Sequence, residues 1–382
     1  MNKIDNLKKV DWDFAQAKTN GTTHSFHPYP AKFIPQIPLT LIKELSYKGD
    51  TVYDPFLGSG TTCVEANALN RNAIGNDVNE LAVLISKVKT TPIDIEKIRS
   101  LNSMINRTFI RIEQFYDIHY EKIKIEKPTI VNLDLWFLDF VIDELVIIKD
   151  EILNLQDEDL RNFCLIALSG IIVKVSRQDS DTRYVRVEKK IERKDVFDKF
   201  VKQLNKNIEL MKKCYNSLKM GETTVKVADT RIEGIFEENS ADLAVTSPPY
   251  PNAYDYHLYH KYRLFWLDMN PRDLRKNEIG AHADYSKKNG HTEFDFKKDM
   301  EKSFKTVSKI LKKDKYFVFV IGDSILKGRN IKNNELLREV SENTPFKYIS
   351  EFSRNLNLRK KSFNPKIGNI KTEKILIFKN IK

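Results

Sequence analysis

The spacing of apolar residues changes twice along the chain and divides it into three parts. From residue 38 to 90, helical spacing alternates with short apolar runs around a glycine-rich turn, which predicts a strand–helix–strand unit. From about 93 to 218 the segments are long and charged, and apolar residues such as Phe137, Val141 and Ile148 recur at helical spacing. After residue 218 the pattern of short strands returns.

Short β-forming runs in the two outer parts predict the strands of one sheet. These runs are 51–53, 72–75, 225–228, 243–245, 316–321 and 374–378. Helices are predicted between them, for example over residues 295–313. Strands that alternate with helices favour an α/β fold, so we expect a Rossmann-like, mostly parallel sheet interrupted by a largely helical insertion. The expected boundaries are 1–90 and 223–382 for the two halves of the sheet domain, and 91–222 for the insertion.

The glycine-rich turn, DPFLGSGTT at 54–62, follows a predicted strand and opens a predicted helix. Gly58 and Gly60 allow a tight turn and close approach of a ligand, and the helix N-terminus beyond them presents unpaired N–H groups. The third glycine of the dinucleotide fingerprint and the Gly-Lys-Ser/Thr ending of a phosphate-binding loop are both missing. The turn therefore does not favour a pyrophosphate ligand.

Three acidic residues follow predicted strands and suggest a nucleoside pocket. Asp54 begins the glycine-rich turn, Asp77 ends the next strand, and Asp229 follows a third. An acid at the position of Asp77 can accept hydrogen bonds from both ribose hydroxyls, and Asp229 can accept one from an adenine amino group. The alternative is that all three are turn or N-cap residues. Their agreement at three strand ends favours an adenosine pocket.

A second site is predicted where the strand Leu243–Val245 runs into Ser247-Pro248-Pro249-Tyr250. Two prolines in series remove two backbone donors and fix φ, so the segment cannot continue as a central strand. It leaves free carbonyl acceptors beside a hydroxyl and an aromatic ring, which suits a planar base that bears an amino group. Hydrogen bonds to Ser247 Oγ and the Pro248 carbonyl would stabilise positive charge on an attacking amine, and the Tyr250 ring would stack on the base. The alternative is an ordinary Pro-Pro turn.

Composition and charge narrow the class of protein. The 382 residues, 41% of them hydrophobic, are enough for a sizeable core. The net charge of +11 suits a polyanion such as nucleic acid, unless it only reflects a lysine-rich composition. Cys63, Cys164 and Cys214 are too widely spaced for a zinc site or a disulfide framework, and no metal is expected. No signal-peptide-like or membrane-spanning run is present, so we expect a cytoplasmic protein that has no membrane partner.

These motifs, taken in order, resemble those of the amino-methylating DNA methyltransferases that use S-adenosylmethionine. HPYPAKF at 27–33 resembles the family's cofactor-contacting N-terminal motif, 54–62 its glycine-rich motif, and TSPPY at 246–250 its catalytic motif. Asp77 corresponds to the ribose-binding acid of the family and Asp229 to its adenine-contacting acid. The resemblance implies a methyltransferase sheet that binds S-adenosylmethionine and acts on double-stranded DNA.

The resemblance also assigns site residues. The cofactor-binding residues that it implies are Lys32, Phe33, Asp54, Phe56, Gly58, Gly60, Thr61, Thr62, Asp77 and Asp229. The catalytic residues that it implies are Ser247, Pro248, Pro249 and Tyr250. It covers roughly residues 24–90 and 223–265 together with the closing strands. Residues 1–90 then form the cofactor-binding half, 223–382 the catalytic half, and the insertion at 91–222 a candidate target-recognition region.

The target base is predicted from the residue before Pro-Pro-Tyr. In the family that this chain resembles, serine there is typical of N4-cytosine enzymes, whereas aspartate or asparagine is more usual in N6-adenine enzymes. Ser247 therefore implies N4 of cytosine, in a base flipped out of the duplex, as the atom that is methylated. The resemblance also implies a restriction-modification system, in which a cognate restriction endonuclease is the expected partner. N6-adenine, an RNA base amine such as N2 of guanine, and an inactive DNA-binding module stay open as alternatives. The C5-cytosine branch is disfavoured because the sequence has no Pro-Cys dipeptide.

Candidate DNA contacts lie in three basic segments. Arg177, Arg183 and Arg186 follow an apolar run in the insertion and are predicted to contact phosphates or guanine edges, unless they belong to a solvated loop. Aromatic and basic residues also interleave between Tyr254 and Arg263, where they can line a base pocket or a strand channel. Four residues of this second region have helical spacing and are assigned to the core: Leu258, Tyr262, Phe265 and Trp266. In the third segment the predicted phosphate contacts are Arg354, Arg359, Lys360 and Lys361.

Overall fold

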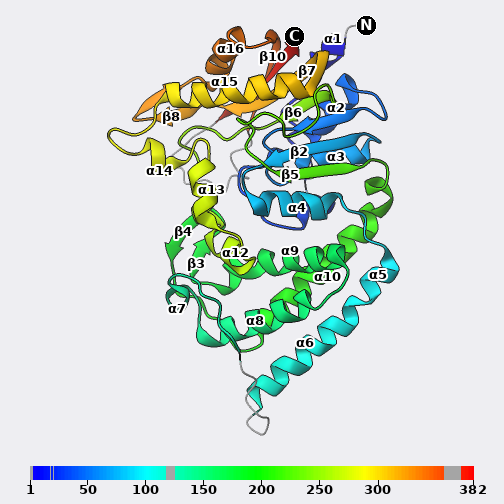
Figure 1. The fold of residues 1–382 in the computed structure, drawn as a ribbon, viewed down its shortest axis with the longest axis vertical. Helices are drawn as coiled ribbons and strands as arrows, with labels where there is room; N and C mark the ends of the chain where they lie inside the picture. The colour runs from blue at the N-terminus through cyan, green and yellow to red at the C-terminus, as the bar shows by residue number, and fades with distance from the viewer. Residues whose placement is uncertain (1–2, 18, 20, 118–124, 357–370) are drawn as a thin grey trace.

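The structure, a computed structural model, describes the chain except for residues 1–2, 18, 20, 118–124 and 357–370. A sheet with helices on both faces occupies the upper part of Figure 1, and a mainly helical body lies below it. The two parts are joined through α4 (Glu80–Thr90), which packs against both.

One sheet of seven strands forms the upper part, in the order β10-β11-β7-β6-β1-β2-β5. The strands are β1 (Thr51–Asp54), β2 (Asn72–Asp77), β5 (Thr223–Val227), β6 (Ala241–Thr246), β7 (Leu311–Gly322), β10 (Phe346–Asn355) and β11 (Thr372–Asn380). Strand β11 is antiparallel to both of its neighbours, β7 and β10, and the other strand pairs of this sheet are parallel. The predicted Rossmann-like, mostly parallel sheet is confirmed, and every predicted strand is present. The strand β10 was not predicted.

Helices cover both faces of this sheet. They are α2 (Gln36–Leu45), α3 (Thr61–Ala68) and α4 around the cofactor half, and α15 (Glu293–Ile310) and α16 (Asn333–Glu342) around the catalytic half. Neighbouring strand residues enter different cores: Val52 packs with α2, whereas Tyr53 packs with α15. Because both faces are buried, the central strands are nearly continuous runs of apolar residues rather than alternating ones. Because such runs are visible in the sequence, the central strands could be predicted from it.

The helical body contains most of the predicted insertion. Its elements are α5 (Ile95–Arg99), α6 (Leu101–Tyr116), α7 (Leu133–Trp136), α8 (Asp139–Leu153), α9 (Glu158–Val175), β3 (Gln178–Ser180), β4 (Arg183–Arg186) and α10 (Asp195–Leu218). Its core also takes in Leu81 of the cofactor half and Tyr262 and Trp266 of the catalytic half. The body is therefore built around residues from outside the 91–222 range, and those boundaries stay a prediction.

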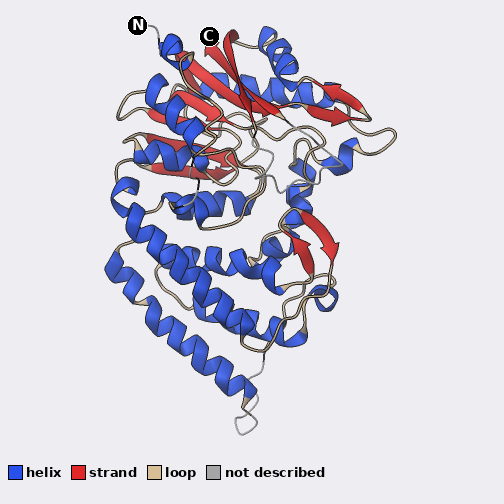
Figure 2. Ribbon diagram, turned by 180° about the vertical axis from the view of Figure 1, so that it is seen from behind, coloured by secondary structure: helices blue, strands red, loops and turns tan. Residues whose placement is uncertain are grey.

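Short helices connect β6 to α15: α11 (Tyr256–Tyr259), α12 (Lys261–Trp266), α13 (Pro271–Asn277) and α14 (His282–Tyr285). The strands β8 (Ser324–Leu326) and β9 (Arg329–Ile331) form a hairpin between β7 and α16. Near the N-terminus lie α1 (Lys3–Leu7) and a 3₁₀ turn at Thr23–Ser25. The hairpins β3–β4 and β8–β9 lie on the same side of the molecule in Figure 1 and in the reverse view of Figure 2.

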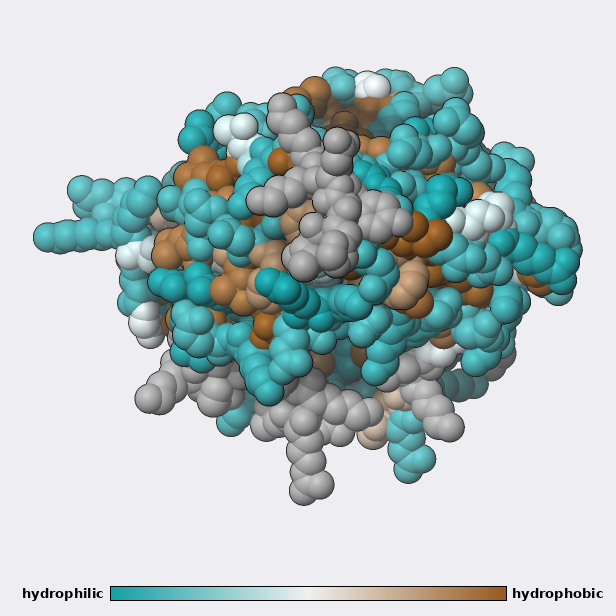
Figure 3. All heavy atoms as spheres, turned by 90° about the horizontal axis from the view of Figure 1, so that it is seen from below, coloured by the Kyte–Doolittle hydropathy of each residue, from teal (hydrophilic) through white to brown (hydrophobic). Residues whose placement is uncertain are grey.

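The outside of the helical body is mostly hydrophilic. Figure 3, which views the molecule from the end of this body, shows hydrophilic residues over most of the visible surface and hydrophobic patches between them. Amphipathic helices with one face in a core produce such a surface. No helix in the described ranges is long and apolar enough to cross a membrane.

Candidate active site

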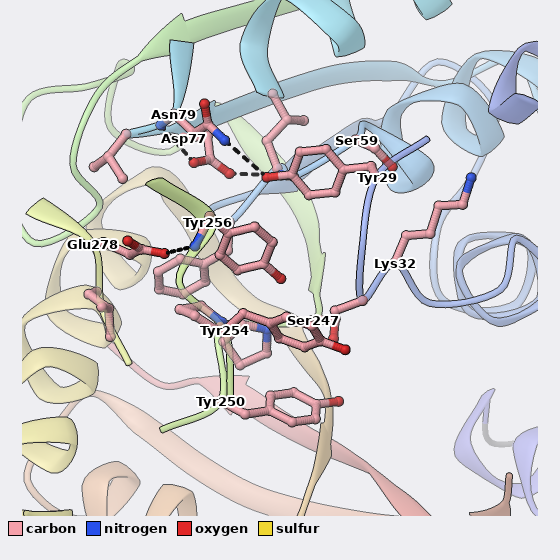
Figure 4. A pocket seen from close by; sticks show the side chains of 18 of the residues that line it. Tyr29, Lys32, Ser59, Asp77, Asn79, Ser247, Tyr250, Tyr254, Tyr256 and Glu278 are labelled. Carbon is pink, nitrogen blue, oxygen red and sulfur yellow. Dashed lines mark hydrogen bonds between the residues drawn. The ribbon is translucent and has the colours of Figure 1, made fainter. Parts of the chain in front are cut away.

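A cavity of about 330 Å³ lies at the carboxyl ends of the parallel strands β1, β2, β5 and β6. Ligands of open α/β sheets bind at this edge, because the loops that leave the strands there surround a crevice. The predicted site residues that line the cavity are Lys32, Phe33, Phe56, Gly58, Thr61, Asp77, Asp229, Ser247, Pro248, Pro249 and Tyr250. The two predicted sites are thus parts of one cavity. Figure 4 shows Asp77 toward one end and Ser247 and Tyr250 toward the other.

The two glycines of the turn have different roles. Gly58 lines the cavity with φ of +47°, and its N–H donates to Asp77 Oδ2 over 2.8 Å. Gly60 does not line the cavity; a Cβ there would come within 2.6 Å of Ser86 Oγ, and its φ is +74°. Gly58 therefore shapes the ligand site, whereas Gly60 allows the turn to pack against α4.

Asp77 is the acid best placed for a ligand. Its Oδ1 accepts the Asn79 N–H over 2.9 Å, in addition to the Gly58 bond. Burial raises the pKa of Asp77 to about 6, although these two N–H donors lower it. Asp77 faces the cavity, as a ribose-binding acid requires.

Asp54 lies beneath the cavity instead of in its wall. It is buried, and its Oδ1 accepts from Thr246 Oγ1 over 2.7 Å and from the Phe56 N–H over 3.2 Å. Thr62 is similar, since its hydroxyl donates to the Val245 carbonyl over 3.2 Å. Both side chains tie the glycine-rich turn to strand β6, directly before the predicted catalytic segment Ser247–Tyr250. The structure thus supports a positioning role for Asp54 and Thr62, in place of direct contact with a ligand.

Asp229 lines the cavity but is already paired. Both of its carboxylate oxygens bind Arg231, with Oδ2 2.6 Å from Nη2. Arg231 also pairs with Asp299 over 3.1 Å. All three strand-end acids accept the N–H two residues ahead, so the turn reading is correct for each, and Asp77 and Asp229 face the cavity as well.

The predicted catalytic segment, Ser247–Tyr250, follows β6 after Thr246 and turns along the cavity wall. The Tyr250 hydroxyl lies 3.3 Å from Glu373 Oε1 and 3.4 Å from the Val320 carbonyl, which ties the tyrosine to the neighbouring strands. Gly280 packs directly against this segment, because a Cβ there would come within 2.7 Å of the Tyr250 carbonyl oxygen. These contacts hold the ring of Tyr250 in the wall.

Several residues of the cavity were not predicted. Tyr29 stacks on Tyr256 and on His260 with ring centroids 5.6 and 5.0 Å apart, and Asn79 Nδ2 donates to its hydroxyl over 3.3 Å. Glu278 accepts from the Tyr256 N–H over 2.6 Å and pairs with His257 over 2.7 Å. Burial is the main cause that raises the pKa of Glu278. Only Tyr29 gave a signal in the sequence, as part of the motif at 27–33.

Ser59 provides a test of whether the cavity fits a polar ligand. Its side chain lines the cavity, and its buried Oγ has no hydrogen-bond partner in the described part of the chain. Buried hydroxyls are normally paired, so a bound group that donates to or accepts from Ser59 would satisfy it. Together with the carboxylate of Asp77 and the aromatic walls, this agrees with a nucleoside that bears polar substituents.

Lys32 lies at the edge of the cavity, and Figure 4 shows its amine directed away from the other labelled side chains. The Nζ atom donates to the His24 carbonyl over 3.0 Å. Lys32 thus fastens the N-terminal segment, and its contribution to a ligand would come from its aliphatic part.

The three arginines of the insertion differ in what they can reach. Arg177 donates to the carbonyls of Asp134 and Leu135 over 3.4 and 3.2 Å, so it is held by the helical body. The side chains of Arg183 and Arg186 are 66% and 43% exposed on the β3–β4 hairpin. Only these two are therefore open to a large partner; the prediction for Arg177 does not agree with its contacts.

The β3–β4 hairpin is docked on the helices that follow the catalytic segment. Asp181, in its turn, pairs with Arg263, whose side chain is 1% exposed. Arg263 Nε also donates to the Ser169 carbonyl over 3.1 Å, and Gln178 Nε2 donates to the Tyr259 carbonyl over 3.2 Å. The hairpin is thereby held beside the catalytic half of the protein.

The other basic and aromatic predictions had mixed outcomes. Tyr254 and Tyr256 line the cavity, and the core assignment is confirmed for Tyr262 and Trp266, which are each 1% exposed. Leu258 and Phe265 are only partly buried. The phosphate contact predicted for Arg354 is wrong, because its buried guanidinium pairs with Glu373 over 3.1 Å. The predicted contacts outside the described residues are Arg359, Lys360 and Lys361.

Metal-binding clusters are absent from the described residues, and the described cysteines lie away from the cavity. No group of three or more His, Cys, Asp or Glu side chains there could hold a metal ion. Cys63, Cys164 and Cys214 are all buried, and none of them lines the cavity. The described residues that line the cavity offer hydroxyl, carbonyl, carboxylate and aromatic groups.

Comparisons with known proteins show which proteins this chain is similar to. A family model described as DNA methylase matches residues 2–88. The Type II methyltransferase M.MvaI of Kocuria varians is 26% identical over 96% of this chain and 93% of its own length. M.MjaII of Methanocaldococcus jannaschii, also a Type II methyltransferase, is 24% identical over 94% of this chain and 82% of its own.

Solved structures are more distant. A putative DNA modification methylase from Thermus thermophilus, complexed with S-adenosylmethionine, is 17% identical over 41% of this chain and 52% of its own, with a TM-score of 0.25. The family model and the relatives confirm the predicted resemblance to DNA amino-methyltransferases and, with it, S-adenosylmethionine as the cofactor.

Proposed function

We propose that this chain, as one of the Type II DNA methyltransferases that it resembles over nearly its whole length, methylates the N4 amine of a cytosine flipped out of double-stranded DNA. S-Adenosylmethionine supplies the methyl group from its sulfonium. The cognate partner would be a restriction endonuclease that reads the same DNA sequence.

One observation carries the proposal: a single cavity contains both Asp77 with the glycine-rich turn and the Ser247–Tyr250 segment. Methyl transfer needs the donor and the acceptor amine in one enclosed space with their reacting atoms close together. Tyr254 and Tyr256 line the same space and bring aromatic surface to it. The cavity thus has the parts that such a reaction requires.

Each part of the cavity has a chemical role in this proposal. Asp77 accepts hydrogen bonds from ribose hydroxyls, and Ser59 Oγ is available for a further polar group. Ser247 Oγ and the Pro248 carbonyl accept hydrogens of the base amine, whose nitrogen gains positive charge in the transition state. Tyr250 gives the base an aromatic wall.

The choice of base depends on Ser247. A serine before Pro-Pro-Tyr is typical of N4-cytosine enzymes in the family that the chain resembles, which favours cytosine over adenine. N6-adenine is the alternative, because the same oxygen acceptors can hold either amine.

DNA is the partner that agrees with the charge and with the hairpin. The net charge of +11 attracts phosphates, and Arg183 and Arg186 are exposed on a hairpin that is docked beside the catalytic half. A duplex bound there could place a flipped base at the cavity.

Nucleoside mass spectrometry tests the proposal. Plasmid DNA from cells that produce the protein should contain N4-methylcytosine, and DNA from cells with Ser247→Ala should contain at least about a hundredfold less, since an oxygen acceptor of the developing charge is lost. Isothermal titration with S-adenosylmethionine serves as the control, because the variant should bind it nearly as well as the wild type. N6-methyladenine would overturn the cytosine assignment, and DNA without any methylated base would overturn the proposed reaction.

A further inference from the structure

A carboxylate on the last strand of the sheet lies beside the catalytic segment. Glu373 belongs to β11, where it stands opposite Gly322 of β7 and Arg354 of β10. Its side chain is 14% exposed and lines the cavity. No motif of the sequence pointed to it.

Glu373 binds the catalytic tyrosine and a buried arginine. Its Oε1 lies 3.3 Å from the Tyr250 hydroxyl, and its Oε2 accepts from Arg354 Nη1 over 3.1 Å. Arg354 is 6% exposed, so the ion pair is mostly out of water and its geometry is fixed. Burial and the charge of Glu373 raise the pKa of Tyr250, which therefore keeps its proton and acts as a donor.

The proposed reaction moves positive charge along the cavity. The amine nitrogen forms a bond to the methyl carbon as the bond from carbon to sulfur breaks, and the sulfur keeps that electron pair and becomes neutral. The nitrogen becomes positive and later loses one proton to water. Charge thus passes from the donor to the amine held at the Ser247–Tyr250 segment, which is the part of the cavity where Glu373 lies.

We propose that Glu373 is a positioning residue of the catalytic segment: it orients Tyr250 through the hydroxyl and places a negative charge where the amine becomes positive. Such an interaction is stronger in the transition state than in the ground state, so it acts on kcat more than on binding. This inference rests on the proposed methyl transfer. Arg354 is part of the arrangement, because it holds the carboxylate in place.

Glu351 provides a matched control. Its side chain is also 14% exposed and paired, with Arg338 over 2.7 Å and Lys374 over 3.4 Å, and it belongs to the adjacent strand β10. It does not line the cavity. If the loss of an ion pair at the β10–β11 edge were the whole effect, Glu351→Gln and Glu373→Gln should lower kcat to the same extent.

The experiment measures kcat and KM on a DNA duplex, and the dissociation constant of S-adenosylmethionine, for four variants of the full chain. Glu373→Gln should lower kcat about tenfold, with cofactor affinity unchanged within about twofold. Tyr250→Phe should lower kcat by a similar factor. The double variant should lose little more than either single variant, because both changes break the same contact. Glu351→Gln should keep the wild-type kcat.

The outcomes separate the inference from the proposed function. Wild-type kcat in Glu373→Gln, full additivity in the double variant, or an equal loss in Glu351→Gln would each overturn the role of Glu373. Should Glu373→Gln fail to fold, an unchanged kcat in Tyr250→Phe would overturn it instead. A wild-type protein that binds the cofactor but methylates no DNA would reject the proposed function itself.

Discussion

The carboxyl edge of the sheet and the β3–β4 hairpin both carry predicted functional residues, but the predictions agree with the structure to different degrees. At the sheet edge, Asp77 and the Ser247–Tyr250 segment meet in one cavity. On the hairpin, Arg183 and Arg186 are exposed, whereas Arg177 is bound to carbonyls of the helical body.

The difference follows from how each region is built. In a mostly parallel sheet, the topology brings the residues that end neighbouring strands to one edge, independently of the contacts that their side chains make. The hairpin is placed by individual side-chain contacts, above all the pair of Arg263 with Asp181. Residue type therefore predicted position better at the sheet edge, where the backbone brings the residues together, than on the hairpin, where side-chain contacts decide which residues are exposed.

The largest expected effect concerns that docking. Asp181→Asn removes the carboxylate that, in the described ranges, pairs with the buried Arg263, and should lower the free energy of unfolding by about 2 kcal/mol. This loss of unfolding free energy is smaller than is usual for a buried ion pair, because the Asp181 side chain is 40% exposed. Urea denaturation measures it. Asp179→Asn is the control, since Asp179 pairs over 3.7 Å with the exposed Arg183; an equal loss there would show that the hairpin is not held by Arg263.

The next effect tests the sheet edge. Asp77→Asn should weaken S-adenosylmethionine about tenfold, through lost hydrogen bonds to a charged acceptor. The pKa of Asp77 is about 6, so wild-type affinity should rise as the pH increases through 6, when the carboxylate ionises, and the variant should lack this rise. Calorimetric titration between pH 5 and pH 8 measures both.

Asp54 is the matched control for this pH dependence. Its pKa is also about 6, but its carboxyl lies beneath the cavity and does not line it. Burial raises the pKa of both acids above the value in the unfolded chain. Each protonated carboxyl therefore contributes to the stability of the fold at low pH, and this contribution is lost as the pH increases from about 4 through 6. Asp54→Asn should keep the pH-dependent rise in cofactor affinity; loss of the rise in this variant would contradict the assignment to Asp77.

The smallest effects are expected from the exposed arginines. Arg183→Ala and Arg186→Ala should each weaken DNA binding a few-fold and reduce the slope of log affinity against log salt by about 1, the value for one lost phosphate contact. Fluorescence anisotropy across a salt series measures the slope. Arg177→Lys should leave it unchanged, and an equal reduction in that variant would show that Arg177 also reaches DNA.

Two residues that were predicted to bind the cofactor make structural contacts and do not line the cavity. Gly60 and Thr62 belong to the glycine-rich motif, yet one packs on Ser86 and the other binds the Val245 carbonyl. A motif shows that a segment is needed, but the direction of each side chain depends on the neighbouring helix and strand. The sequence carries no information about α4 or β6 being those neighbours.

The sequence by itself determined the strands of the large sheet except β10, the order of the motifs and the end of the sheet where chemistry is expected. It could do so because both-sided burial leaves continuous apolar runs, and parallel strands present their carboxyl ends together. Only the tertiary structure decided that Glu373 reaches Tyr250, that Tyr29 stacks on His260, and that Arg263 holds the hairpin. These contacts join segments far apart in the chain, and which of them meet depends on strand order and helix packing rather than on any local pattern.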